Sequence, residues 1–266
     1  MLSEDRLRLM ARELCAVGGV RAVALGGSRA RGTHRPDSDI DLGLYFEGDV
    51  DRVALDRLAA RWTGGPVTVA SPGAWGPWVE SGAWLVVEGT AVDWILRDAR
   101  RVAEQCERAR LGHFAFHTQP GHPLGFLDVS YAGEVAMGVP LCDETALLAG
   151  LAEGLTPYPE PLRAAMLQRL WQVDFLLDGA EKGAKGADAA YVALCAGTAA
   201  MIIAHAWHAL AGRWVLNEKG LVPGVSGLPI DTRGFAEAAA SVLSTLGSTP
   251  EELHRSIAAM RAVPRP

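Results

Sequence analysis

Short apolar runs of the kind that form β-strands occur only in the first 143 residues of this chain, and this restriction limits the fold more than any other feature. We expect five strands, at residues 20–25, 40–46, 66–70, 83–87 and 91–96. A tight turn at Glu88 and Gly89 joins the last two. Helical segments separate the strands, so the pattern predicts an α+β fold with a mixed sheet and flanking helices.

Apolar residues at helical spacing predict the helices that accompany this sheet. The first helix precedes the first strand, with Ser3 as its N-cap, and others are expected at residues 51–62, 98–111 and 123–137. After residue 143 the pattern indicates helices alone, at 162–178, 189–212 and in two further segments, the last capped by Thr249 with Pro250 and Glu252. Residues 179–188 are expected to form a mobile loop. We therefore predict a sheet-containing domain over residues 1–148 and an all-helical domain over residues 149–266.

The charge of the chain narrows the class of partner. Asp and Glu outnumber Lys and Arg by 31 to 25, which gives a formal net charge of −6. A protein whose main task is to hold a phosphate backbone carries the opposite sign, so we do not expect nucleic acid as the partner. A small acceptor molecule, including a cationic one, fits this charge better. The sequence does not predict the oligomeric state.

The cysteines and one long apolar segment bear on localisation. Cys15, Cys106, Cys142 and Cys195 are scattered and form no C-x-x-C pair, which indicates buried free thiols in a reducing compartment. No signal-peptide pattern is seen at the N-terminus. Residues 189–212 lack Asp, Glu, Lys and Arg, but they are alanine-rich and weakly hydrophobic for a span, so we interpret them as a buried core helix. We expect a cytoplasmic protein with no membrane partner.

Two short motifs have the composition that phosphoryl transfer requires. Gly26, Gly27 and Ser28 follow a predicted strand and open a short helix, where glycine lets the backbone approach a phosphate. Asp39 and Asp41 alternate on the next strand, so they project from one face with Cα atoms about 6.7 Å apart. Carboxylates at this spacing can converge on a pair of divalent ions. The alternative interpretation is that these acids are solvated turn residues.

A third carboxylate is expected from a later strand. Asp93 is the single acid in an apolar run, and an edge-strand acid facing water is the alternative. Three carboxylates brought together without a cation would raise each other's pKa, so the set predicts magnesium, which prefers oxygen ligands shared with phosphates. Asp37 follows Pro36 and is expected to cap a turn.

These residues together resemble the nucleotidyltransferase superfamily that includes DNA polymerase beta. Its signature is a Gly-Ser pair, then Asp-x-Asp, then a third acid on a later strand, and residues 1–100 of this chain carry it. Within the superfamily, the order of domains resembles the streptomycin/spectinomycin-type antibiotic adenylyltransferases. In those enzymes a Trp-bearing helix precedes a Gly and a Lys that contacts ATP, and here Trp207, Gly212 and Lys219 occur in that order.

The resemblance implies a role for each matching residue. The nucleotide would be held by Gly27, Ser28, Ser38 and Lys219. Two magnesium ions would be bound by Asp39, Asp41 and Asp93, and Asp93 would be the general base or the third ligand. Glu80 and Glu88 are rival bases if Asp93 is only a ligand. The resemblance fails at Cys195, where those enzymes carry an acid, so the antibiotic itself cannot be transferred to this chain.

Other residues leave alternatives open. Lys219 is one of only three lysines in an arginine-rich chain, which favours a phosphate contact over an ordinary surface lysine. His113, His117 and His122 lack a recognisable fourth zinc ligand, so loop and helix-face histidines are the preferred interpretation. Trp75, Trp78 and Trp84 either form the floor of an acceptor or base pocket or pack beneath a loop, and packing is the preferred interpretation.

The sequence therefore predicts a magnesium-dependent nucleotidyltransferase that moves a nucleoside monophosphate from ATP or another nucleoside triphosphate onto a hydroxyl of a small molecule, with aminoglycoside-like antibiotics among the candidates. The first alternative keeps this chemistry with a macromolecular acceptor, either a tRNA end or a protein hydroxyl of the toxin–antitoxin type. The second is a non-catalytic nucleotide-binding protein, which would not need all three acids.

Overall fold

The computed structural model describes residues 2–79 and 81–266, so Glu80, one of the two rival bases, lies outside the described residues. The chain forms two compact units, and each is described by itself. Unit 1 comprises Met1–Ala109, Ala115–Gly121 and Gly125–Thr156, and unit 2 comprises Arg110–Phe114, His122–Leu124 and Pro157–Pro266. The main change from one unit to the other thus falls at Thr156, whereas the sequence predicted a domain boundary after residue 148.

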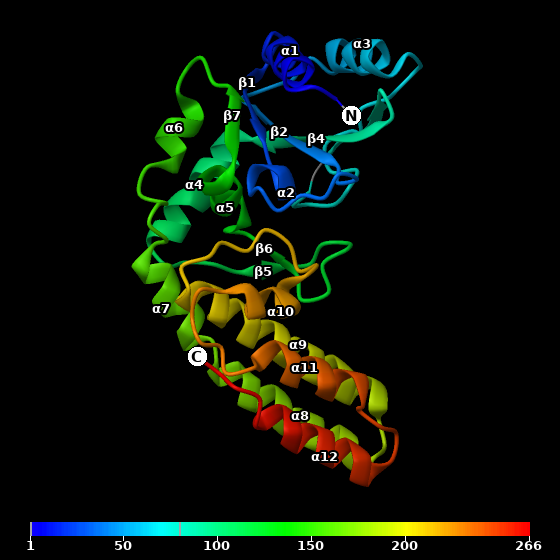
Figure 1. Cartoon of the computed structure of the whole chain (residues 1–266), viewed down its shortest axis with the longest axis vertical. Helices are drawn as coiled ribbons and strands as arrows, with labels where there is room; N and C mark the ends of the chain where they lie inside the picture. The colour runs from blue at the N-terminus through cyan, green and yellow to red at the C-terminus, as the bar shows by residue number, and fades with distance from the viewer. Residues whose placement is uncertain (1, 80) are drawn as a thin grey trace. The chain divides into compact units, whose positions relative to one another are not determined.

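Unit 1 is built on a mixed sheet, as the sequence predicted, and four of its five strands are predicted ones; the fifth, β7, was not predicted. Its strands lie in the order β3-β4-β2-β1-β7, with β2 and β4 parallel and the other neighbours antiparallel (Figure 1). The strands are β1 (Val20–Leu25), β2 (Ile40–Phe46), β3 (Gly82–Val87), β4 (Thr90–Asp98) and β7 (Val139–Cys142). A separate two-stranded sheet pairs β5 (Phe116–His117) with β6 (Phe126–Leu127).

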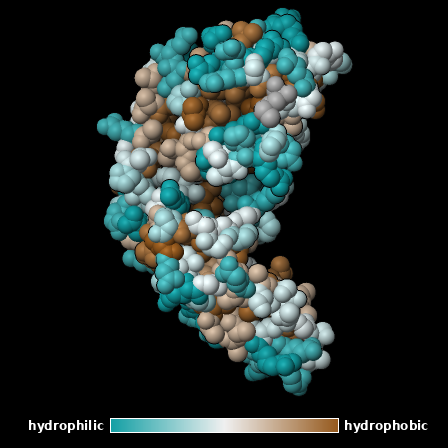
Figure 2. Space-filling view, viewed as in Figure 1, coloured by the Kyte–Doolittle hydropathy of each residue, from teal (hydrophilic) through white to brown (hydrophobic). Residues whose placement is uncertain are grey.

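Helices α1 (Glu4–Cys15) and α3 (Arg52–Thr63) cover one face of this sheet (Figure 1). Ser3 caps α1 by accepting a hydrogen bond from the Arg6 N–H, which confirms the predicted helix start. Over α1 and α3, most of the surface seen in Figure 2 is hydrophilic, as expected of helices with a single buried stripe. The remaining helices of unit 1 are α2 (Gly27–Ala30), α4 (Ala99–Arg110), α5 (Ser130–Met137) and α6 (Leu147–Ala152).

Alternation along the strands gives the sheet two chemically different faces. On β2 and β4, Leu42 and Trp94 are among the side chains that pack with α1 and α3 in one hydrophobic core. Residues of the opposite parity, which include Asp41, Tyr45 and Arg97, project from the other face. The packed core on one face thus fixes the positions of polar side chains on the other.

Two expectations for unit 1 were wrong, and side chains that bond to the backbone explain both. Residues 66–70 form no strand, because the N–H and C=O of Val69 bond to the side chains of Asp56 and Arg52 on α3. The predicted helix over residues 123–137 begins only at Ser130. Before it, the Asp128 carboxylate accepts hydrogen bonds from the N–H groups of Ala115 and Val129 and holds a turn.

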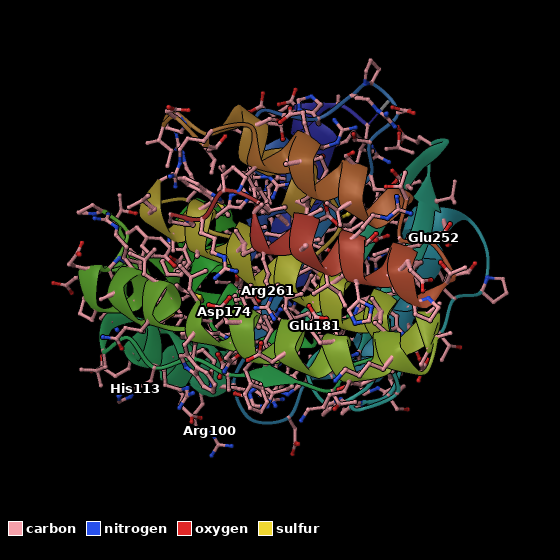
Figure 3. All side chains as sticks on the ribbon, turned by 90° about the horizontal axis from the view of Figure 1, so that it is seen from below. Arg100, His113, Asp174, Glu181, Glu252 and Arg261 are labelled. Atoms are coloured by element: carbon pink, nitrogen blue, oxygen red, sulfur yellow. A yellow bond between two sulfur atoms is a disulfide. The ribbon has the colours of Figure 1, made fainter. Side chains whose placement is uncertain are left out.

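Unit 2 is helical, as predicted. Its main helices are α7 (Glu160–Gln168), α8 (Trp171–Lys185), α9 (Ala189–Leu210), α11 (Phe235–Ser244) and α12 (Pro250–Arg261), with a short α10 (Leu221–Gly224) and a 3-10 turn at Val225–Gly227. Thr249 and Glu252 form the predicted capping box of α12. Arg261 of α12 lies beside Asp174 of α8 at 3.7 Å (Figure 3).

The expected helix over residues 162–178 and the expected loop over 179–188 were both wrong. The chain breaks between α7 and α8 at Arg169 and Leu170, and the N–H groups of Leu170, Gln172 and Val173 bond three residues back. Helix α8 then continues through Gly179 and Gly183, where a Cβ would meet the Tyr191 hydroxyl at 3.1 Å and the Tyr191 ring at 2.8 Å, respectively. Tertiary packing therefore overrides the weak helix propensity of glycine.

Helix α9 explains the long apolar segment of the sequence. It is the one helix in the described chain long and apolar enough to cross a membrane by length and composition. In this structure it is a core element of unit 2, and Ile203 and Trp207 are among its residues that pack against α8, α11 and α12. Packing within the unit therefore accounts for its composition.

The free-thiol expectation was wrong for two of the four cysteines. Cys15 at the end of α1 is bonded to Cys142 of β7, with Cα atoms 6.6 Å apart across 127 residues of sequence. Packing of α1 beside β7 brings the two cysteines together. No local sequence pattern at either cysteine could therefore have predicted the bond. Cys106 and Cys195 remain buried thiols. The cytoplasmic localisation stays a prediction.

A buried ion pair ties the polar face of the sheet to α5. The Arg97 guanidinium, 4% exposed, donates through two nitrogens to the two carboxylate oxygens of Glu134, both at 2.8 Å. The Tyr131 ring lies 4.9 Å from the same guanidinium. A bidentate pair of this kind is costly to break, because Arg97 without its partner would be a buried charge.

We predict that E134A lowers the free energy of unfolding by about 3–5 kcal/mol, since it leaves the Arg97 charge buried without its carboxylate. The double variant R97M/E134L should lose much less, because both charges are removed together. Urea unfolding followed by circular dichroism measures both values. Equal losses in the single and double variants would contradict the assigned role of the pair.

Candidate active site

The Gly-Ser motif forms the turn between β1 and α2, and it lies directly against Asp41. The Gly26 N–H donates to the Asp41 C=O at 2.8 Å. Gly27 has a φ of +59°, and a Cβ built on it would lie 1.7 Å from Asp41 Oδ2. Only glycine allows both this backbone conformation and this close approach. The motif therefore holds the Asp41 carboxylate beside the start of α2.

The first turn of α2 is a suitable place for phosphate oxygens. Gly26, its N-cap, makes no side-chain capping bond to the helix. The first N–H groups of a helix have no partner within the helix and favour an anion. Ser28 is half-buried in this turn and adds a hydroxyl donor.

Asp41 and Asp93 are register neighbours on the parallel strands β2 and β4. Neighbouring strands lie about 4.8 Å apart, and register neighbours project from the same face. This face is the one opposite the core formed with α1 and α3. The structure thus brings together two of the three predicted acids, and the sheet supports both.

Asp39 precedes β2 and is exposed. Its segment is held by Arg29, which is not among the site residues predicted from the sequence. The Arg29 guanidinium donates to the Ser38 C=O at 2.6 Å and to the Asp39 C=O at 3.1 Å. The Ser38 hydroxyl accepts a hydrogen bond from the Arg35 N–H at 2.9 Å. Arg29 therefore joins α2 to the Asp-x-Asp segment, and its position directly after Ser28 was the available sequence signal.

Burial and neighbouring charges raise the pKa values of Asp41 and Asp93. Burial, and then the charges of Asp41 and Asp39, raise the pKa of Asp93 to about 6. Burial, followed by Asp39 and Glu134, raises the pKa of Asp41, while Arg31 and Arg29 oppose that shift. The charge of Asp39 thus disfavours the charged forms of Asp41 and Asp93, and the charge of Asp41 disfavours that of Asp93.

The donor set fits a divalent cation that is shared with a substrate. Within residues 2–79 and 81–266, no group of three His, Cys, Asp or Glu side chains is arranged to hold a metal ion by itself. However, the room that Gly27 leaves for the Asp41 carboxylate and the raised pKa of Asp93 are features expected of acids that a cation neutralises. Magnesium sites of this type are completed by phosphate oxygens and water.

The surroundings of Glu88 do not favour it as the base. Its side chain lies in the β3–β4 turn and accepts from the Arg6 guanidinium of α1 at 2.8 Å. Helix α1 covers the face opposite Asp93. Glu80, the other rival base, lies outside the described residues.

Residues predicted from the helical half of the chain lie in unit 2. Lys219 is exposed, and its N–H donates to the Asn217 side chain at 2.8 Å. Its contact with the triphosphate stays a prediction. Cys195, which stands where the resembling enzymes carry an acid, is buried in the core of unit 2.

The three histidines are divided between the units. His117 lies in unit 1, where its ring is 3.2 Å from Asp128 Oδ2 and stacks on Trp78 at 4.1 Å. His113 and His122 belong to unit 2. His117 therefore has a structural role in holding the β5–β6 hairpin against Trp78.

Trp75, Trp78 and Trp84 differ in how far they are buried. Trp78 is 9% exposed and packs with Phe126 and Tyr131, in agreement with the packing interpretation. Trp84 is 68% exposed, so that interpretation was wrong for this residue. Trp75 stacks on Trp84.

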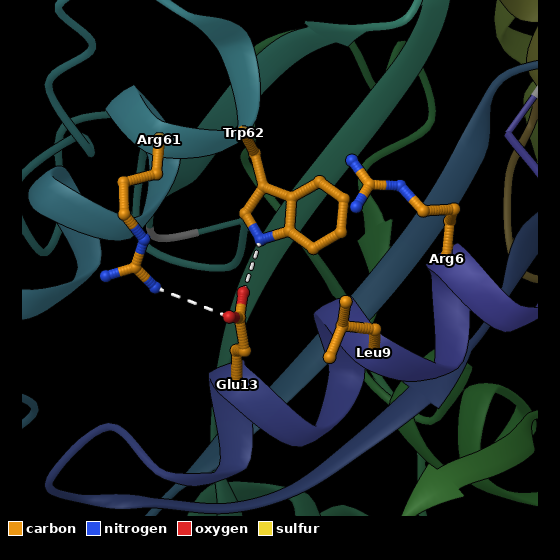
Figure 4. Close-up of a pocket in the computed structure, with 5 residues that line it drawn as sticks. All are labelled: Arg6, Leu9, Glu13, Arg61 and Trp62. Atoms are coloured by element: carbon orange, nitrogen blue, oxygen red, sulfur yellow. Dashed lines mark hydrogen bonds and ion pairs between the residues drawn. The ribbon is translucent and has the colours of Figure 1, made fainter.

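A surface pocket between α1 and α3 is separate from these acids. It is lined by Arg6, Leu9, Glu13, Arg61 and Trp62 (Figure 4). Its charged side chains are paired with each other or with neighbouring groups: Glu13 accepts from Trp62 Nε1 at 2.8 Å and lies 3.6 Å from Arg61. It opens between the helices that cover the other face of the sheet, so we do not assign it to the active site.

Comparison with known proteins agrees with this geometry. Residues 7–85 match the family profile of the nucleotidyltransferase domain. The crystal structure of a nucleotidyltransferase-like protein from Exiguobacterium sibiricum 255-15 is similar at 13% sequence identity and a TM-score of 0.41, over 98% of this chain and 73% of that one. Similarity at that level supports no conclusion about fold or function. No curated protein matches the sequence.

The matched segment contains the Gly27–Ser28 turn, Asp39 and Asp41. The match identifies residues 7–85 as a nucleotidyltransferase domain. Together with the geometry of the site, it supports a nucleotidyltransferase enzyme. Its resemblance to the antibiotic adenylyltransferases stays a prediction.

We predict that D93N raises the Tm of the metal-free protein by about 2 °C or more at pH 8. Folding raises the pKa of Asp93 from 3.8 to about 6, so ionising this carboxylate costs stability as pH rises between those values. The advantage of D93N should therefore disappear as pH falls from 6 to 4. Thermal melts across this pH range, with EDTA present, measure it. An advantage that is independent of pH would contradict the shift.

We predict that G27A displaces the Asp41 carboxylate and lowers NMP transfer by about 100-fold. Gly32 provides the matched control, since it also has a positive φ, of +67°, but a Cβ built on it would meet nothing within 4 Å. G32A should therefore show the same backbone strain and retain activity. Pyrophosphate release and the Mg²⁺-dependent rise in Tm are the two measurements. Similar losses in both variants would assign the effect to strain alone.

Proposed function

We propose that the protein transfers a nucleoside monophosphate from ATP, or another nucleoside triphosphate, to a hydroxyl of a small molecule, with the release of pyrophosphate. The observation that carries this proposal is the parallel register of Asp41 and Asp93 beside the Gly27 turn. It provides two carboxylates and a phosphate-binding turn on one face of a sheet. These are the parts that phosphoryl transfer requires.

In the proposed reaction, Asp93 accepts the proton of the acceptor hydroxyl. The oxygen then forms a bond to the α-phosphorus, the bond from that phosphorus to the β-phosphate oxygen breaks, and pyrophosphate leaves with both electrons of the broken bond. The pKa of Asp93, raised to about 6, leaves most of this carboxylate ionised at neutral pH while making it a stronger base than an exposed aspartate.

Asp39 and Asp41 would hold the magnesium ions, and these would supply charge neutralisation and alignment of the phosphates. Asp93 would be the third ligand in the alternative in which it is not the base. The Gly27 turn and the Ser28 hydroxyl bind the departing phosphates. Arg29 keeps the Ser38–Asp39 segment against α2 before any substrate binds. The chain thus orients the reacting groups in advance.

The net charge of −6 supports a small acceptor over a nucleic acid. Aminoglycosides and lincosamides are the first compounds to test, on the strength of the resemblance to antibiotic adenylyltransferases. A screen of pyrophosphate release with these compounds and ATP, GTP, CTP or UTP tests the assignment. If no compound gives pyrophosphate release with any of the four nucleotides, the antibiotic proposal is removed. Transfer to a copurifying RNA or protein would replace the small acceptor with a macromolecular one.

We predict that D39N abolishes transfer and leaves the Tm within a few degrees of wild type, since Asp39 is exposed. D37N is the matched control, because Asp37 is an exposed acid of the same turn that pairs with Arg35 at 3.3 Å. D37N should keep its activity. A fully active D39N protein would refute the metal role of this residue.

A further inference from the structure

The edge strand β3 places a large exposed aromatic side chain next to the proposed base. Trp84 is the register partner of Asp93 across the antiparallel pair β3–β4. Such partners project from the same face with Cβ atoms about 5 Å apart. The Trp84 side chain is nevertheless 68% exposed, which is unusual for a large aromatic ring system that gains much free energy from burial.

A second tryptophan supports this ring from one side. The Trp75 and Trp84 ring centroids are 4.0 Å apart, and the planes differ by 14°. Trp75 can lie against the sheet because position 82 is glycine, where a Cβ would come within 2.8 Å of the Trp75 ring. One face of Trp84 is therefore covered by Trp75 and fixed in direction.

A buried glutamine holds the loop that carries Trp75. Gln119, 4% exposed, donates to the Trp75 C=O at 2.5 Å and accepts from the Trp78 N–H at 2.9 Å. Gly76, with a φ of +104°, lets this side chain approach, since a Cβ there would be 2.7 Å from it. Buried hydrogen bonds thus hold the backbone at Trp75 and Trp78, whereas Trp84 on β3 is exposed.

Across the sheet, four groups follow one another in register: Trp84, Asp93, Asp41 and the Gly26 turn. In the proposed function, pyrophosphate leaves on the side of the Gly26–Ser28 turn. Attacking and leaving oxygens lie in line across the phosphorus, so the acceptor enters from the opposite side. That side is the one occupied by Trp84.

We propose that the outer face of Trp84, backed by Trp75, is the acceptor-binding platform of this enzyme and takes a small molecule whose reactive hydroxyl is attached to a ring with a flat apolar face. This proposal rests on the proposed function for the direction of attack. Stacking of the ring fixes the acceptor, and the neighbouring Asp93 meets its hydroxyl. Trp84 therefore selects ring-bearing acceptors over open-chain ones.

Saturation-transfer NMR tests the platform without requiring turnover. The protein is loaded with Mg²⁺ and a non-hydrolysable ATP analogue. The analogue fills the nucleotide site, so the probes cannot bind there. The probes are myo-inositol and 4-hydroxybenzyl alcohol, which carry saturated and aromatic rings, and sorbitol, an open chain with the same number of hydroxyls as inositol. We expect transfer to the protons of at least one ring probe, none to sorbitol, and about a tenfold weaker affinity in W84A.

Two further variants separate stacking from a general effect on the protein. W84F keeps an aromatic face and should retain much of the binding. W171A removes an equally accessible tryptophan, 64% exposed on α8 of unit 2, and should change nothing. With an acceptor found by the pyrophosphate screen, W84A should raise its KM and leave the KM of the nucleotide unchanged.

The outcomes against the proposal are distinct from failure of the proposed function. Equal binding to wild type and W84A, or no transfer to any ring probe, overturns the platform even in an enzyme that is active. A weaker affinity of W84A for the ATP analogue would assign the ring to the nucleobase instead and would also overturn it. If ring probes bind in a Trp84-dependent way but the protein shows no transferase activity, the proposed platform stands and the proposed nucleotidyl transfer is rejected.

Discussion

The parallel pairing of β2 with β4 is the constraint on which the rest of the site depends. It places Asp41 beside Asp93, and the charge of Asp41 contributes to the raised pKa of Asp93. The strands stay together because Leu42 and Trp94, on the opposite face, are buried under α1 and α3. Apolar packing on one side of the sheet thus sustains an electrostatically unfavourable arrangement on the other, which a bound cation would relieve.

The polar face continues this arrangement beyond the acids. Glu134 contributes to the raised pKa of Asp41, and it is fixed by its bidentate pair with Arg97. On the other side of Asp41, the Gly27 turn approaches so closely that a methyl group would collide with the carboxylate. A buried ion pair and a glycine turn therefore restrict the same side chain from two directions, which is how a site is ordered before its ligands arrive.

The edge of the sheet has a different character from its centre. Gly82 removes a side chain so that Trp75 can lie on the sheet, and Trp75 in turn supports Trp84. Hydrogen bonds from the buried Gln119 hold the loop that carries Trp75. The register partners Trp84, Asp93 and Asp41 lie on β3, β4 and β2, so the side chains change from aromatic to acidic across three neighbouring strands. In the proposed function, this order suits an acceptor with a ring at the edge and a nucleotide with phosphates nearer the centre.

The sequence by itself determined what depends on near neighbours: the caps at Ser3 and Thr249, the β3–β4 turn, the strand parity of Asp41, and the glycine turn. Only the tertiary structure decided which strand lies beside which, and therefore that Asp93 meets Asp41 and that Cys15 meets Cys142. It also decided that α8 continues through its glycines and that residues 66–70 form no strand. The physical reason is that periodicity fixes which residues share a face of their own element, whereas the partner of that face is chosen by packing between segments far apart in the chain.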